Sequence, residues 1–311
     1  MSDLEITFLG TGAAIPSKKR NHIGIVLKYK GDLFLLDCGE NIQRQFLYTK
    51  LSPMKIKAIF ISHLHGDHIL GLPGVIQSLS FMGRKKELKI FGPKGVEEIV
   101  EKSLTFGYCT IDFDVVVREI KENKPITIYE EEDFKFIAYP TEHGIPSYSY
   151  IFKEIKKPKL DIEKAKELGI KIGPDLKKIK EGKPVKSVYG DIVYPEQVLL
   201  APKDGLCVAY SGDTKPLKDF ALYLKDLKCS TLIHEATFDD SQKEMAEETF
   251  HSTIGGAYEV FKLSNAKNLI LTHISARYDK DEYFKLYEDN VKKYDKEIII
   301  SEDLKSYKVR A

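Results

Sequence analysis

Residues 63–68, His-Leu-His-Gly-Asp-His, place four potential metal ligands within six positions. Neutral imidazole binds borderline cations such as zinc, and a carboxylate adds charge and can bridge two ions. Side chains at i and i+2 of an extended segment point to the same side, so His63 and His65 can bind one ion. The glycine bend and a predicted helix turn Asp67 and His68 toward a second ion. The pattern predicts a dinuclear metal site rather than a His-rich surface loop.

Further polar residues occur where later apolar segments end. These segments, predicted as strands, are 134–138, 206–211, 231–233 and 268–272. The residues that follow them are His143, Asp213, Glu235 and His273. Strand ends that meet at one edge of a sheet can build one site from distant parts of the chain. We therefore expect His143, Asp213 and His273 to complete the metal centre.

The earlier elements indicate a mixed architecture. Segments 6–9, 24–29 and 33–37 read as an antiparallel meander with turns between them. Helices are predicted at 41–49 and 69–81. The sequence therefore predicts an α/β fold.

Composition limits the setting of this site. The 311 residues are 42% hydrophobic and 31% charged, as expected for an enzyme-sized globular chain. No apolar run reaches the ~18 residues of a membrane span, and the acidic start differs from a signal peptide. We expect no membrane partner and a cytoplasmic location. The four cysteines form no Cys-x-x-Cys pair and are expected to be reduced: Cys38, Cys109, Cys207 and Cys229.

Positive charge is concentrated in residues 153–186. This segment has twelve lysines and six acidic residues, although the whole chain has a net charge of only +1. Its glycines and prolines frame two short predicted helices, 162–168 and 175–180. The segment is either a solvated charged face or an inserted arm that binds a polyanion.

The ordered motifs resemble those of the metallo-β-lactamase superfamily, and within it the ribonuclease Z family of transfer-RNA 3′-end-processing endonucleases. The resemblance covers nearly the whole chain. It rests on the metal ligands in their order and on the basic arm with Gly173-Pro174. The further matching motifs are residues 10–21, residues 234–238 and His251-Ser252-Thr253.

The resemblance implies one metallo-β-lactamase-like domain over residues 1–311, a four-layer αββα sandwich, with residues 153–186 as an inserted Lys-rich substrate-binding arm. It also implies two Zn²⁺ per subunit, with Mn²⁺ as the alternative metal. One ion would bind His63, His65 and His143, the other Asp67, His68 and His273, and Asp213 would bridge both.

Three residues are candidates for proton transfer. The resemblance assigns Asp67 the role of proton acceptor for the attacking water. His251 is the candidate acid for the departing oxygen, and Glu235 is expected to hold its imidazole and raise its proton affinity. Judged alone, Glu235 could instead cap a helix and His251 could be a surface residue.

The remaining histidines are weaker candidates. His234 directly precedes Glu235, so its side chain should face away from the site, and we interpret it as structural. His22 lies in a polar segment that could contact phosphate. The loop 16–21 is a candidate RNA contact because its Lys and Arg side chains can pair with phosphate oxygens.

The resemblance implies that the protein is a zinc-dependent endoribonuclease that removes the 3′ trailer of precursor transfer RNA and leaves a 3′-hydroxyl. Two ions about 3.5–4 Å apart can activate water and neutralise phosphate charge. The arm would hold the RNA far from the cut, and the resemblance implies a homodimer. The alternatives are a thioester hydrolase or lactamase, a small-molecule phosphodiesterase, and a metal-stabilised RNA-binding protein without catalysis.

Overall fold

The computed structural model describes residues 4–108 and 110–309, which leaves Cys109 outside the described residues. Two compact units make up the chain, a large unit 1 and a small unit 2. Unit 2 consists of Glu131–Phe134 and Glu154–Gly205, and unit 1 contains the rest. Among the described helices, none is long and apolar enough to cross a membrane.

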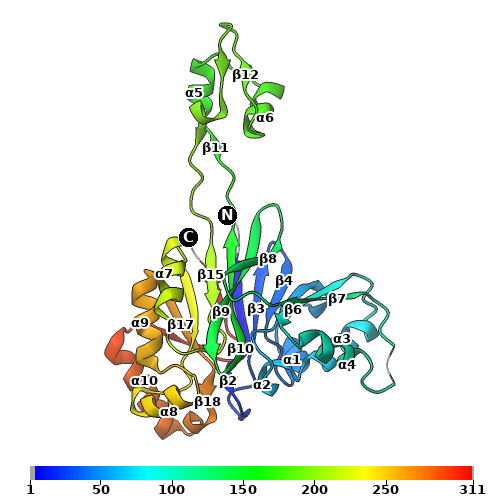
Figure 1. Cartoon of the computed structure of the whole chain (residues 1–311), viewed down its shortest axis with the longest axis vertical. Coiled ribbons are helices and arrows are strands. Elements are labelled where there is room, and N and C mark those ends of the chain that lie inside the picture. Colours follow the sequence, from blue (N-terminus) through cyan, green and yellow to red (C-terminus); the bar gives the residue numbers. More distant parts are fainter. Residues whose placement is uncertain (1–3, 109, 310–311) are drawn as a thin grey trace. The chain divides into compact units, whose positions relative to one another are not determined.

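Unit 1 is built on two seven-stranded sheets (Figure 1). The first sheet has the order β20 (Ser306–Val309), β1 (Leu4–Gly10), β3 (Gly24–Tyr29), β4 (Asp32–Leu36), β5 (Ile56–Phe60), β6 (Leu88–Pro93) and β7 (Val115–Ile120). The second has the order β19 (Ile299–Ile300), β17 (Asn268–Thr272), β16 (Thr231–Glu235), β15 (Cys207–Tyr210), β10 (Ile145–Glu154), β9 (Phe134–His143) and β8 (Ile126–Glu130). The predicted early meander is confirmed, because β1, β3 and β4 pair antiparallel.

Alternating side chains explain why the sheets stack. In β4, Leu33 and Leu35 belong to the cluster that packs against helices, whereas Phe34 points to the other sheet. Phe34 lies 5.0 Å from Phe136 of β9, and Phe60 stacks on the same ring at 4.3 Å. Each such buried side chain stabilises the fold by about 1.5–3 kcal/mol relative to exposure. The inner layer is therefore aromatic.

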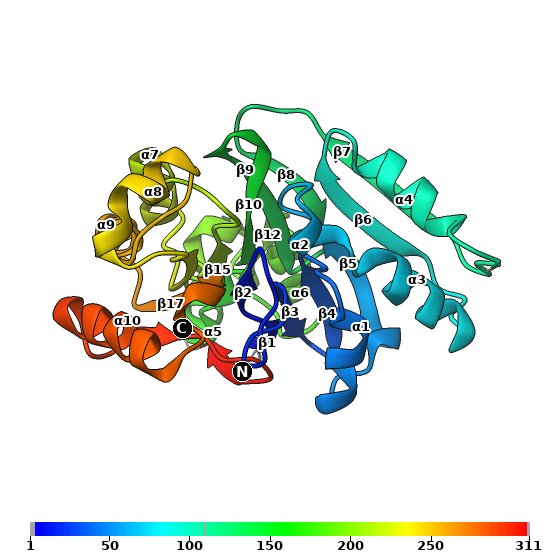
Figure 2. The ribbon, with the colours of Figure 1, turned by 90° about the horizontal axis from the view of Figure 1, so that it is seen from below.

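Helices cover the outer faces of the two sheets, which gives the four-layer αββα arrangement (Figure 2). The first sheet is covered by α1 (Ile42–Gln45), α3 (Leu72–Phe81) and α4 (Val96–Leu104). The second is covered by α7 (Lys218–Asp226), α9 (Ile254–Ser264) and α10 (Asp281–Tyr294). The short elements near the site are β2 (Gly12–Ala13), α2 (Gly66–Ile69), α8 (Lys243–Glu248) and β18 (Ile274–Ser275).

Unit 2 has its own small core. Its elements are β11 (Lys159–Leu160), α5 (Ile162–Glu167), α6 (Pro174–Lys180), β12 (Val185–Lys186), β13 (Ile192–Val193) and β14 (Leu199–Leu200). The buried core residues are Ala165, Ile170, Ile179, Val185, Val193 and Val198. Two of them, Val193 and Val198, lie beyond the predicted arm 153–186, so the compact unit extends further along the chain than the lysine-rich stretch.

Candidate metal centre

The carboxyl ends of three parallel strands form one side of the candidate centre. Strands β15, β16 and β17 pair parallel and in register, with Tyr210 opposite Ile233 and Glu235 opposite Thr272. Asp213 and His273 follow β15 and β17, and His143 ends β9. Because these ends meet, side chains that are far apart in sequence come together.

The segment after β5 forms the other side. His63 and His65 lie in the loop beyond the end of the strand, and the structure brings their ring nitrogens together. His63 Nε2 is 3.0 Å from His65 Nδ1, which is 3.2 Å from His143 Nε2. Three nitrogens around a tetrahedral ion with bonds of about 2.0–2.1 Å would lie about 3.3 Å apart. This group of three imidazoles therefore has the spacing of a metal site.

A second group lies beside the first. Asp67 and His68 are in α2, and His68 Nε2 is 3.2 Å from His273 Nε2. Asp67 Oδ2 is 3.3 Å from His273 Nε2 and 3.6 Å from His68 Nε2. The structure thus brings together the three side chains predicted for a second ion.

Asp213 lies between the two groups. Its Oδ2 is 3.3 Å from Nε2 of both His68 and His273, and 3.6 and 3.7 Å from Nε2 of His63 and His143. Its Oδ1 is buried and has no hydrogen-bond partner among the described residues. Burial alone would raise the pKa of Asp213, but the neighbouring imidazoles hold that pKa well below its usual range. An ionised, shared carboxylate with a spare oxygen fits a bridging ligand.

Four of the five ligand imidazoles turn Nε2 to the centre because their Nδ1 is engaged elsewhere. The Nδ1 contacts are His63 with Ser62 Oγ (3.0 Å), His68 with Asp37 Oδ2 (2.8 Å), His143 with the Phe250 carbonyl (3.0 Å) and His273 with Thr237 Oγ1 (2.9 Å). Such partners orient metal-binding imidazoles and fix their tautomers. His65 differs, because it offers Nδ1 to the centre.

Asp37 is a supporting residue that sequence reasoning missed. It is fully buried and accepts hydrogen bonds from Ser62 N, Ser62 Oγ and Tyr210 Oη at 2.7–2.8 Å, in addition to its contact with His68. The charges of Asp213 and Asp37 overcome burial and raise the pKa of His68 well above its ordinary value. The signal in the sequence was a carboxylate directly after the apolar strand 33–36.

Left-handed backbone conformations cluster around the centre. Ala14, Asp37, Phe250 and His273 have φ of 51°, 55°, 58° and 56°. Such conformations cost about 1–3 kcal/mol each for residues with a Cβ, and they persist where the surroundings hold them. Ala14, Asp37 and Phe250 contact candidate ligand side chains, and His273 is itself a candidate ligand, so these strained conformations help to place the centre.

Glu235 and His251 form a pair at the edge of the centre. His251 Nδ1 lies 2.9 Å from Glu235 Oε1, and the buried carboxylate also accepts from the backbone N–H of Thr214, Ser252 and Thr237. Burial would lower the pKa of His251, but the charge and hydrogen bond of Glu235 raise it to about 9. A protonated imidazole with its Nδ1 engaged can present Nε2 to a substrate.

The weaker candidates lie elsewhere. His234 is fully buried and its Nδ1 bonds its neighbour's carbonyl, away from the ligands. Arg20 of the loop 16–21 is bound inside the protein by Thr11 Oγ1 and the Ser301 carbonyl, at 2.7 and 2.8 Å, and packs over Phe284. Arg20 is therefore not free to bind RNA, whereas Lys18 in the same loop is exposed.

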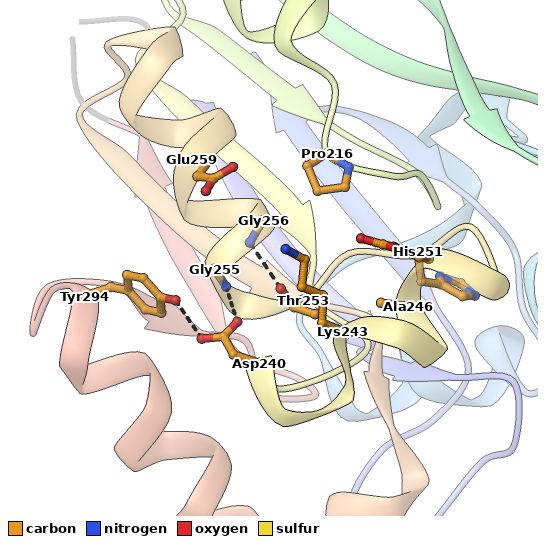
Figure 3. Close-up of a pocket in the computed structure, with 11 residues that line it drawn as sticks. Pro216, Asp240, Lys243, Ala246, His251, Thr253, Gly255, Gly256, Glu259 and Tyr294 are labelled. Carbon is orange, nitrogen blue, oxygen red and sulfur yellow. Dashed lines mark hydrogen bonds between the residues drawn. The ribbon is translucent and has the colours of Figure 1, made fainter.

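The centre opens into a cleft of about 650 Å³, lined in part by His65, Asp67, His143 and His251. A second cavity of about 240 Å³ lies behind the segment that carries His251 (Figure 3). There Asp240 accepts hydrogen bonds from Tyr294 Oη (2.6 Å) and the backbone N–H of Gly255 (2.7 Å). Figure 3 shows the His251 ring pointing away from Lys243 and Pro216, so the imidazole belongs to the cleft.

The donor set fits divalent metal ions. Nitrogen and carboxylate oxygen in two neighbouring groups suit zinc or manganese, and the convergence of these lone pairs fits a cation between them. Together with the αββα sandwich, this site defines the class of the protein as a metal-dependent hydrolase of the metallo-β-lactamase fold.

Comparisons with known proteins define the family. The chain is 66% identical to Ribonuclease Z of Methanocaldococcus jannaschii over 309 residues, which cover 99% of this chain and 98% of the relative. It is 50% identical to Ribonuclease Z of Methanococcus maripaludis strain C7 over 99% of both chains. The chain belongs to the ribonuclease Z family and is a metal-dependent endoribonuclease.

Solved structures agree with this assignment. The human tRNase Z short form, ELAC1, has a TM-score of 0.70 and 27% identity and covers 99% of this chain and 100% of its own. The metallo-β-lactamase fold protein YhfI of Bacillus subtilis shares the fold, with a TM-score of 0.68, 16% identity, and coverage of 99% and 100%. A family model described as Anti-Pycsar protein Apyc1 matches residues 4–161.

Proposed function

We propose that this chain is a zinc-dependent endoribonuclease that removes the 3′ trailer from precursor transfer RNA and leaves a 3′-hydroxyl on the transfer RNA. The observation that carries the proposal is the convergence of two ligand groups on Asp213 beside the Glu235/His251 pair. The human structural neighbour is itself described as a tRNase Z, which supports this substrate.

The proposed ligands are His63, His65 and His143 for one Zn²⁺, and Asp67, His68 and His273 for the other, with Asp213 shared. Bound divalent ions supply stabilisation of the charge that develops on the phosphate and make water more acidic. Mn²⁺ is the alternative metal, because selectivity depends on geometry and availability.

The protein side chains would handle the protons. Asp67, next to the cleft, would accept a proton from the attacking water. The departing group is the 3′ oxygen of the transfer RNA, since the phosphate stays with the trailer. His251, protonated at neutral pH because Glu235 raises its pKa, would donate a proton to that oxygen.

Unit 2 would hold the folded RNA through its lysines. Eight exposed lysines of this unit make no ion pair among the described residues: Lys159, Lys164, Lys166, Lys171, Lys177, Lys180, Lys186 and Lys203. Lysines of this kind neutralise RNA phosphates. The proposal includes the homodimer that the family resemblance implies and a cytoplasmic location.

The test is cleavage of an end-labelled precursor transfer RNA by protein loaded with Zn²⁺ or Mn²⁺. We expect one cut directly 3′ of the discriminator nucleotide, a 3′-hydroxyl on the transfer RNA, and loss of cleavage after chelation that either metal restores. RNA binding without cleavage would instead support a binding protein. Rapid turnover of small diesters with indifference to precursor RNA would support a small-molecule phosphodiesterase.

We expect His251→Gln to slow precursor cleavage by about 10²–10⁴-fold, the usual contribution of a general acid, with unchanged metal content. Hydrolysis of bis(p-nitrophenyl) phosphate should fall much less, because p-nitrophenolate leaves without a proton. The measurement is kcat on both substrates together with metal analysis. Equal losses on both substrates would contradict the role of an acid.

The pH–rate profile of Glu235→Gln, compared with that of the wild type, tests the same acid role of His251. The acid form of His251 is lost as pH rises through its pKa, so activity should fall on the alkaline side. Because Glu235 raises that pKa, its neutralisation should move the alkaline limb of the pH–rate profile to lower pH.

A further inference from the structure

His22 is a buried histidine next to the metal centre that has no part in the mechanism above. Its side chain is 4% exposed, and it lines the same cleft as Ala14, His65 and Asp67. We propose that His22 is a positioning residue for Asp67 and acts through the peptide group of Ala14. The inference rests on the proposed metal centre, in which Asp67 is a ligand.

Two hydrogen bonds join His22 to Asp67. His22 Nε2 lies 3.2 Å from the Ala14 carbonyl oxygen, and since a carbonyl only accepts, this nitrogen carries the hydrogen. The Ala14 backbone N–H donates to Asp67 Oδ2 at 2.7 Å. The same carboxylate oxygen faces Nε2 of His273 and His68. Ala14 therefore fixes the oxygen that faces the second ligand group.

The conformation of Ala14 shows why it needs to be held. Its φ of 51° is in the left-handed region, which residues with a Cβ seldom adopt without support. In this conformation its N–H can face Asp67 while its carbonyl faces His22. The exposed Ala14 side chain has few neighbours that could hold this conformation. The hydrogen bond from the buried His22 imidazole to the Ala14 carbonyl holds it instead.

Packing ties the two residues to one corner of the fold. A Cβ added to Gly39 would lie 2.6 Å from the His22 Cβ and 2.2 Å from the Asp67 carbonyl oxygen. The His22 Cβ and the Asp67 backbone therefore both pack against Gly39, which places the two residues at the same point of the fold.

The chemical consequence concerns the second ion. Among the described residues, Ala14 supplies the one backbone hydrogen bond to the Asp67 side chain. A carboxylate that loses such a bond can rotate about its last bond and offers its oxygens less uniformly to a metal. Partners of metal ligands typically contribute 10–100-fold to metal affinity or activity. His22 should therefore affect metal binding and kcat, and leave the binding of RNA largely unchanged.

The experiment compares His22→Ala and His22→Gln, since glutamine has an amide N–H in nearly the place of imidazole Nε2. We expect His22→Ala to weaken Zn²⁺ binding in a chelator competition, and to lower kcat on bis(p-nitrophenyl) phosphate, by about 10–100-fold. His22→Gln should restore most of both, and KM for precursor RNA should change little. Glu40→Gln is the control, because Glu40 faces the other ring nitrogen of His22 at 3.9 Å.

Unchanged Zn²⁺ affinity and kcat in His22→Ala would overturn the proposal, and so would a defect that glutamine fails to rescue. If His22→Ala does not fold, His22→Leu fills the same volume without a donor and gives the same comparison. Failure of the wild-type protein to bind Zn²⁺ or to cleave precursor RNA would instead overturn the proposed function, so the two failures are distinguishable.

Discussion

Asp213→Asn should reduce metal content from about two ions per subunit to one or fewer and lower kcat by about 10³-fold, equivalent to about 4 kcal/mol. The amide keeps the shape of the side chain but removes its charge and replaces one oxygen with a donor. Asp213 Oδ2 lies within 4 Å of imidazole nitrogens from both groups. Both ions would therefore lose a ligand.

The loss should also show in thermal melts. Asp213 is a buried carboxylate whose Oδ1 has no partner among the described residues, but the neighbouring imidazoles stabilise its charge and lower its pKa in the metal-free protein. We therefore expect metal-free Asp213→Asn to melt below metal-free wild type, and the rise of Tm on adding Zn²⁺ to shrink. Elemental analysis, kcat and thermal melts measure these effects.

Asp219→Asn, an exposed aspartate on α7, is the matched control and should keep wild-type metal content and rate. A fully active Asp213→Asn protein with two ions would remove Asp213 from the bridging role.

The strands were predictable where apolar runs are bounded by turns. Residues 24–29 and 268–272 are strands with the predicted bounds, and 33–37 is shifted by one residue. The single helix predicted at 69–81 is wrong in one respect, because α2 ends at Ile69 and α3 begins at Leu72. Pro73 in the first turn of α3 favours this new start.

The convergence of the candidate ligand side chains was predictable because their residue types are rare and their positions follow strand ends. Their supporting groups were not. These groups contact the ring nitrogen that faces away from the centre, and they are Asp37, Thr237 and the Phe250 carbonyl. A backbone carbonyl such as that of Phe250 can belong to any residue type, so the sequence gives no sign of it. Sequence patterns identify side chains suited to metal, whereas orientation depends on tertiary packing.

The net charge of unit 2 could not be predicted from the sequence either, because the fold decides which residues belong to the unit. The compact unit holds twelve lysines and twelve acidic residues, so it is neutral as a whole, although its stretch 156–186 remains basic. Acidic residues at 131–133 and beyond 186 join it only through the fold. One of these acidic residues, Glu132, pairs with Lys157, whereas Lys156 pairs with Glu154, which is close in sequence. The lysines without ion pairs are those to test for RNA binding.

Replacement of residues 155–204 by a short Gly-Ser turn should abolish most cleavage of precursor transfer RNA, with kcat/KM lowered by about 10³-fold or more, the loss expected when several phosphate contacts disappear. Hydrolysis of bis(p-nitrophenyl) phosphate should persist. The design is feasible because β10 and β15 pair antiparallel up to Lys153 and Cys207, so a turn can join them. Deletion of 154–186 alone would split the core of unit 2 and leave Val193 and Val198 exposed.

A charge variant separates the lysines from the fold of the unit. Neutralising Lys166, Lys171, Lys177 and Lys180 to Gln should weaken RNA binding and reduce the slope of log affinity against log salt by about one per lost phosphate contact. The control is the double variant Lys285→Gln/Lys293→Gln, which neutralises exposed lysines of α10 in unit 1. This variant should change RNA affinity and its salt dependence little.

The replacement of residues 155–204 also has an outcome that would contradict a role in RNA binding. A surface that only recognises RNA contributes nothing to the hydrolysis of a small diester. If the replacement lowered the hydrolysis of the small diester as much as the cleavage of RNA, unit 2 would instead stabilise the metal centre.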